Sequence, residues 1–160
     1  PFSIGASPLR DKQLAVRIHD VIAEHGDGLW LCNDPYVAQF AGAHGARVLN
    51  GVHQAPNPGL WRAIDPDGRY QNAWRRYAHI SAKIVPHCDV RAEVKRQTNS
   101  QVTWYLDRQA VERLNVTYLL WAGGKVREPW VDYIGRERLN FIYKVSANET
   151  PSSGEGQAGL

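Results

Sequence analysis

The sequence contains no methionine, only two cysteines and no long apolar run. A membrane-spanning helix needs about 20 consecutive, mostly apolar residues, so we expect none within these 160 residues. The two cysteines, Cys32 and Cys88, form no CxxC or Cys/His zinc pattern, which argues against a zinc fold. Because Cys32 lies in an apolar run, we predict that it is a small core residue. The sequence leaves open whether the two cysteines form a disulfide.

A strong charge of one sign is also missing. Nineteen Lys and Arg residues stand against 16 Asp and Glu residues, and this net charge of +3 is too small to predict a nucleic-acid partner. The sequence shows no secretory signal peptide. Because the chain opens with Pro1 and has no methionine, we expect it to be a segment excised from a longer protein. The missing membrane span therefore excludes nothing about the parent protein.

The size and composition are those of a single folded domain. The chain has 160 residues, of which 43% are hydrophobic and 22% charged, as is usual for globular proteins. A domain of this length buries about two thirds of its unfolded surface, so it needs no metal or disulfide to fold. We expect a domain over residues 1–145 and a disordered tail over residues 146–160, which are rich in Ser, Gly and Glu.

The first fifty residues alternate between helical and strand patterns. A helix is predicted over residues 10–25, a buried strand over 29–32, and a second helix from Asp34 and Pro35 to the vicinity of Gly45. A short strand follows over residues 47–49. This alternation is typical of a parallel sheet covered by helices. We therefore predict an α/β fold, a single three-layer domain with a mixed, largely parallel sheet.

The remaining elements are less regular. Residues 50–70 carry several prolines and glycines, which predict a long loop with a turn at Pro66-Asp67-Gly68. Beyond it we predict a short helix over 70–77, strands over 80–85, 90–95 and 101–106, a helix from Asp107 to Leu114, a strand over 116–121, a helical turn over 130–134 and a last strand over 139–145 that carries Leu139, Phe141 and Tyr143 on one face.

Residues 50–80 hold the most distinctive mixture of side chains. Aromatic and arginine residues interleave there, and such a surface can stack on sugar rings and bind phosphate. The alternative is that the aromatic residues anchor the loop on the sheet. The candidate binding residues are Asn50, His53, Trp61, Arg62, Asp65, Tyr70, Arg76, Tyr77 and His79.

The same segment offers a second chemistry, because His53, Asp65 and His79 could serve as acid and base in a hydrolase. No HxH or HExxH pattern accompanies them, so we predict no metal, no cofactor and no assigned catalytic residue. Gly123-Gly124-Lys125 lacks the frame of a phosphate-binding loop. The hydrolase hypothesis requires the three side chains to converge in an open cleft.

Three stretches of the chain resemble a known family. They are PFSIGASPLRDKQLAVRI at the start, GARVLNGVHQAPNPGLWRAIDPDGRYQNAWRRYAHI in the middle, and LNVTYLLWAGG with FIYKV near the end. Together they resemble the C-terminal soluble region of large bacterial polytopic membrane proteins, which are glycosyltransferase-C-like and broadly of the YfhO type. Arg75 departs from the family pattern, which has Asn before Arg76 and Tyr77.

The resemblance implies a location and a role. The domain would lie on the extracytoplasmic face of the bacterial cytoplasmic membrane, tethered to its own transmembrane domain. The parent would use a polyprenyl-phosphate sugar, with its catalytic carboxylate in the membrane part, so this segment alone would be inactive. We therefore expect an accessory domain that recognises a glycan or a lipid-linked acceptor. A structural or protein-interaction domain without a ligand is the first alternative, and the hydrolase is the second.

Overall fold

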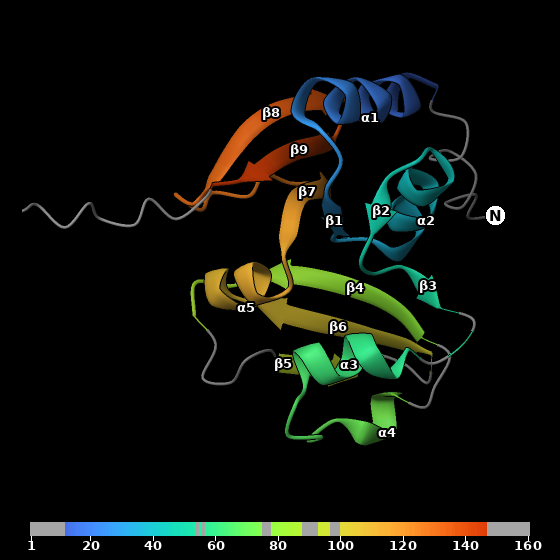
Figure 1. Cartoon of the computed structure of the whole chain (residues 1–160), viewed down its shortest axis with the longest axis vertical. Coiled ribbons are helices and arrows are strands. Elements are labelled where there is room, and N and C mark those ends of the chain that lie inside the picture. The colour runs from blue at the N-terminus through green and yellow to red at the C-terminus, as the bar shows by residue number, and fades with distance from the viewer. Residues whose placement is uncertain are drawn as a thin grey trace, which may run out of the picture.

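The computed structural model describes residues 12–53, 55, 57–74, 78–87, 93–96 and 100–146 (Figure 1). In chain order its elements are α1 (Lys12–His25), β1 (Leu29–Cys32), α2 (Pro35–Ala43), β2 (Arg47–Val48), β3 (Val52–His53), α3 (Pro58–Ile64), α4 (Gln71–Trp74), β4 (Ala78–Ile84), β5 (Glu93–Arg96), β6 (Gln101–Leu106), α5 (Arg108–Arg113), β7 (Val116–Ala122), β8 (Val131–Glu137) and β9 (Asn140–Val145). The predicted segments 1–11 and 147–160 and the second cysteine, Cys88, lie outside the described residues.

The predicted α/β class is confirmed, but the strands divide between two sheets instead of forming one. A five-stranded sheet has the order β2-β1-β7-β9-β8, and a four-stranded sheet has the order β3-β4-β6-β5. We call them the first and second sheet. Both are mixed, since β1 pairs in parallel with β2 and β7, and β4 with β6, while the other described pairs are antiparallel. Figure 1 shows the first sheet with α1 and α2, and the second with α3 and α4 alongside.

The predicted helix signals near the N-terminus are confirmed. In α1, the residues Leu14, Ile18 and Val21 recur at helical spacing and are buried. The helix α2 begins as predicted, because the Asp34 carboxylate accepts hydrogen bonds from the Tyr36 and Val37 N–H groups, and Pro35 follows as the first helical residue. The capping signals of α2 act within one turn, whereas the buried face of α1 packs against distant strands of the first sheet.

The inner strands β1, β7 and β9 of the first sheet carry buried residues on both faces. One face packs against α1 and α2, and its buried residues are Trp30, Cys32, Tyr118, Leu120 and Ile142. The other face joins a second hydrophobic cluster with α3, α5 and the second sheet, and it contributes Leu31, Leu119, Phe141 and Tyr143. The prediction that Cys32 is a core residue is confirmed, and burial raises the pKa of its thiol well above the ordinary range.

A buried asparagine joins the two sheets. Asn50 is only 2% exposed. Its side-chain oxygen accepts a hydrogen bond from the Cys32 N–H (2.9 Å), and its amide nitrogen donates to the carbonyls of Cys32 (2.7 Å) and Ile80 (2.8 Å). Cys32 ends β1 in the first sheet and Ile80 lies in β4 of the second. The side-chain amide of Asn50 therefore makes the hydrogen bonds that the backbone of a strand between β1 and β4 would make.

Two predicted elements are wrong. Residues 50–70 are not one long loop, because they contain β3 and α3; Asn57 caps α3 by accepting from the Leu60 N–H, and Pro58 begins it. Residues 130–134 are not a helical turn, because the strand β8 pairs with β9 there. Leu139 does not share the buried face of Phe141 and Tyr143, since it lies between β8 and β9 and is 67% exposed.

We expect Asn50→Ala to lower the free energy of unfolding by about 2–4 kcal/mol, because it leaves two buried carbonyls and one N–H without partners. Chemical denaturation with an unchanged slope would measure this loss. The matched control is Asn72→Ala in α4, where the asparagine is exposed. A loss at Asn50 no larger than at Asn72 would contradict the bridging role.

Candidate functional site

Asp65 is the best-defined of the predicted site residues, and its role is structural. It is 4% exposed and follows the last residue of α3. Its carboxylate accepts hydrogen bonds from the Arg69 N–H (2.9 Å), the Tyr70 N–H (2.7 Å) and the Trp74 indole N–H (3.0 Å). Each oxygen therefore serves the turn between α3 and α4, and the carboxylate is not presented to a ligand.

The aromatic residues of the same segment belong to the core. The Trp61 ring is buried and contacts two others, stacking on Trp74 with centroids 6.3 Å apart and meeting Trp104 edge-on at 5.7 Å. Tyr70 is partly buried against the same hydrophobic cluster. This arrangement matches the alternative that the aromatic residues anchor the segment on the sheet. Of the predicted arginines, Arg62 is exposed on α3, while Arg76 and Tyr77 lie outside the described residues.

The two histidines of the hydrolase hypothesis do not converge. In the antiparallel pair of β3 and β4, Val52 lies opposite His79 and His53 opposite Ala78. Successive residues of a strand point to opposite faces, so His53 and His79 lie on different faces of the pair. Burial lowers the pKa of His53, and His79 lies 3.5 Å from the Tyr36 hydroxyl. With Asp65 held in its turn, the three groups form no common cleft, so the arrangement that the hydrolase hypothesis requires is not present.

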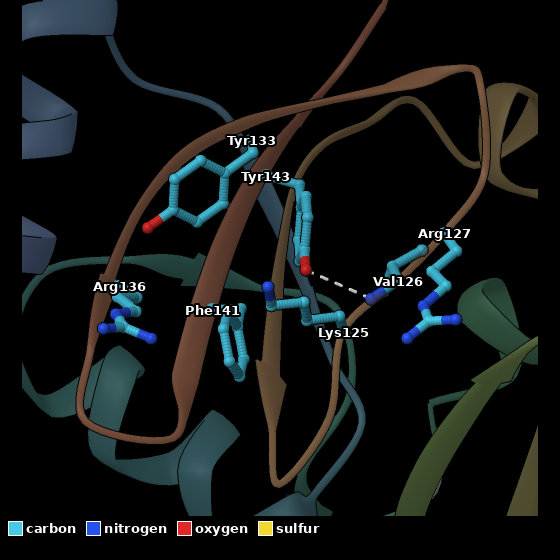
Figure 2. Close-up of a pocket in the computed structure, with 7 residues that line it drawn as sticks. All are labelled: Lys125, Val126, Arg127, Tyr133, Arg136, Phe141 and Tyr143. Carbon is cyan, nitrogen blue, oxygen red and sulfur yellow. Dashed lines mark hydrogen bonds between the residues drawn. The ribbon is translucent and has the colours of Figure 1, made fainter.

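A pocket formed by residues 125–143 combines the cationic and aromatic side chains that were expected to form a binding surface on the segment 50–80. It has a volume of about 310 Å³ and is lined by Lys125, Val126, Arg127, Tyr133, Arg136, Phe141 and Tyr143. We call it the basic aromatic pocket. Figure 2 shows Arg136 on one side of the hollow and Lys125 on the other, with Phe141 between them and the two tyrosine rings above. Three cationic and three aromatic side chains thus surround one space.

A β-bulge places two of these side chains on one face. Tyr133 lies opposite Tyr143, and Arg136 lies opposite Phe141, with a register shift between Tyr133 and Gly135. In a regular strand, residues three apart would point to opposite faces. The extra residue, Ile134, brings Tyr133 and Arg136 to the same side of the sheet. The backbone irregularity therefore creates the pocket wall.

The cations of the pocket have no carboxylate partner among the residues that the structure describes. No carboxylate among the described residues lies within 4.0 Å of Lys125, Arg127 or Arg136, and no acidic residue is among the seven that line the pocket. The Lys125 ammonium lies 5.9 Å from the centroid of the Phe141 ring. An anion entering this space would meet positive charge without competing with an internal partner.

Tyr143 adds a neutral hydrogen-bonding group. Its hydroxyl oxygen accepts from the Val126 N–H at 3.1 Å. Burial raises the pKa of Tyr143, more than this hydrogen bond lowers it, and the neighbouring Tyr133 raises it further. The hydroxyl therefore keeps its proton, and this proton has no acceptor among the residues that the structure describes. It is available to a ligand oxygen.

Sequence reasoning missed this pocket because its residues lie on two strands and a loop, whose pairing the sequence does not show. One signal was available: the cations Lys125, Arg127 and Arg136 stand near aromatic residues in the sequence, on either side of the 128–132 segment. The incorrect helical turn over residues 130–134 hid it, because it separated Tyr133 and Arg136 from the final strand.

Among the described residues, no three His, Cys, Asp or Glu side chains gather as metal ligands would. In the same part of the chain, every helix is too short or too polar to cross a membrane.

We expect Asp65→Asn to lower the free energy of unfolding by about 1–3 kcal/mol, because an amide nitrogen cannot accept the bonds that one carboxylate oxygen accepts. Thermal and chemical denaturation would measure the loss, while ligand binding by the folded variant should be unchanged. Asp67→Asn is the matched control, since Asp67 is exposed two positions along the chain. A stable Asp65 variant that has lost ligand binding would contradict the structural role.

Comparison with known proteins identifies a family without a described activity. Neither the curated proteins nor the solved structures contain a match to this chain. Residues 8–148 match the family model described as "Domain of unknown function (DUF7654)". Because this match spans most of the chain, including both sheets and the basic aromatic pocket, the protein belongs to the DUF7654 family.

Proposed function

We propose that this domain is a binding module that recognises an anionic sugar headgroup, such as the phosphorylated sugar of a lipid-linked glycan, in the basic aromatic pocket. The observation that carries the proposal is the set of three cations, with no carboxylate partner in the described part of the chain, around three aromatic rings. Arginine binds phosphate oxygens in a bidentate manner, and aromatic faces pack on the apolar faces of rings. A glycosyl phosphate satisfies both preferences, because it carries a phosphate group for the arginine and a sugar ring for the aromatic faces.

The dimensions of the pocket support a small ligand. Its volume of about 310 Å³ lies at the lower end for small-molecule sites, which span roughly 300–1,000 Å³. A monosaccharide phosphate fits this space better than an oligosaccharide does. In this arrangement Arg136 and Lys125 bind the phosphate, and the Tyr143 hydroxyl donates to a sugar or phosphate oxygen.

The wider setting is also part of the proposal. We propose an accessory, extracytoplasmic domain of a membrane-embedded glycosyltransferase-like protein that helps to recognise a glycan or a lipid-linked acceptor. This setting rests on the sequence resemblance, whereas the pocket supports only the binding chemistry. We assign no catalytic step to this domain.

Titration calorimetry with a sugar 1-phosphate tests the proposal. We expect the phosphorylated sugar to bind more tightly than the same sugar without phosphate. Arg136→Gln should weaken binding about tenfold, which corresponds to the loss of about 1.4 kcal/mol from one charge-assisted contact. Tyr133→Ser should weaken it as well, because it removes one ring from the wall.

The control is Arg62→Gln, which removes an exposed arginine from the segment that the sequence favoured. It should leave binding unchanged. If Arg62→Gln weakens binding and Arg136→Gln does not, the ligand site lies on the segment 50–80 instead. If neither the phosphorylated sugar nor inorganic phosphate binds at millimolar concentration, the proposal fails and the protein-interaction alternative gains support.

A further inference from the structure

The turn between β8 and β9 carries residues that folding does not require. The two strands end in the pair Glu137 and Asn140, so Arg138 and Leu139 form a two-residue connection. Arg138 has φ +52°, in the left-handed region. Two-residue hairpin turns favour Asn, Asp and Gly, because these residues tolerate such angles. An arginine at the first position is therefore unusual, whereas Leu139 has no positive φ and fits the second position without strain.

Leu139 is unusually exposed for its type. It is 67% exposed, more than any other large hydrophobic side chain of the described residues, and it projects from the end of a hairpin. A leucine on a flat surface is partly covered by its neighbours, but a turn offers little cover. An aliphatic side chain exposed at such a place can insert into the boundary between lipid headgroups and acyl chains.

Cations lie near this leucine in the chain. Arg138 directly precedes it and Arg136 stands three positions before it, and both are exposed. The neighbouring loop is attached by the Gly123 N–H, which donates to the Leu139 carbonyl at 2.9 Å, and it presents Lys125. A Cβ atom at Gly123 or Gly124 would meet no atom within 4 Å, so this loop is open to its surroundings. Glu137, half-buried at the end of β8, is the one acidic residue of the hairpin end.

We propose that this end of the domain, formed by Arg138, Leu139 and the adjoining Gly123–Lys125 loop, docks on the surface of an anionic membrane. An aliphatic side chain flanked by lysine and arginine inserts at the boundary between headgroups and acyl chains, while the cations bind anionic headgroups. A protein partner is less suitable, because a stable protein interface buries roughly 800 Å² on each side and one turn offers far less.

Docking at this end deepens the proposed function by naming the source of its ligand. Arg136 and Lys125 belong both to the pocket wall and to the surroundings of the turn. A domain seated on the turn would hold the pocket at the level of the headgroups, where a lipid-linked sugar phosphate is displayed. The identity of the pocket's ligand rests on the proposed function, but docking itself can be tested without that ligand.

Co-sedimentation of the 160-residue chain with vesicles tests the docking. One set of vesicles contains only phosphatidylcholine, and the other contains about a third of anionic phosphatidylglycerol. We expect binding to the anionic vesicles that weakens as salt rises. Leu139→Ser should lower the partition coefficient about tenfold. Arg138→Gly should lower it about fivefold without disturbing the turn, because glycine adopts a φ of this sign freely.

The matched control is Val16→Ser on α1, which removes another exposed aliphatic side chain (58% exposed) and should leave partitioning unchanged. Equal binding by wild type and Leu139→Ser, or an equal loss with Val16→Ser, would overturn the proposal, as would the absence of binding to anionic vesicles. Leu139→Ser should still bind a soluble sugar phosphate. If the chain docks on vesicles but binds no sugar phosphate, the proposed function fails while docking stands.

Discussion

The architecture depends on the side-chain amide of Asn50. Each sheet is incomplete by itself at this place, because the end of β1 and the middle of β4 expose backbone groups toward each other. The Asn50 amide satisfies the N–H and carbonyl of Cys32 and the carbonyl of Ile80. Two backbone hydrogen bonds add to this connection between the sheets. The Ile80 N–H donates to the Gly51 carbonyl, and the Ala82 N–H donates to the Asn33 carbonyl. A buried amide that is fully paired fixes one relative position of the two sheets.

This joint also explains why the proposed ligand site does not lie where an α/β fold usually places one. In open sheets, ligands bind beyond the carboxyl ends of parallel strands, at the point where the strand order reverses. Here β1 lies between its parallel partners β2 and β7, and Asn33 follows β1 at that point. The Asn33 side chain exchanges two hydrogen bonds of 2.8 Å with the Ala122 backbone. The Asn33 carbonyl also accepts a hydrogen bond from the Ala82 N–H of β4. The usual crevice is filled by the protein itself.

The sequence predicted those features that depend on neighbouring residues. Asp34 and Asp107 cap helices through hydrogen bonds three or fewer residues away, and their signals are readable from spacing alone. It could not predict the partners of Asn50 and Trp61, since both were assigned to a surface loop and both contact residues distant in the chain. The mixture of arginine and aromatic residues in the segment 50–80 is therefore a product of packing, with the tryptophans inward and Arg62 outward.

The proposed ligand site depends on a similar long-range constraint at the other edge of the first sheet. The Arg17 guanidinium of α1 donates to the Ile134 carbonyl at 2.8 Å, and a side chain at Gly135 would displace this guanidinium. The hydrogen bond thus connects α1 to β8 at its bulge. Because the bulge turns Arg136 to the face of Tyr133 and Phe141, α1 supports the pocket from the opposite face without contributing a residue to it. Packing of α1 on one face of the sheet is therefore linked, through the bulge, to the placement of Tyr133 and Arg136 on the other face.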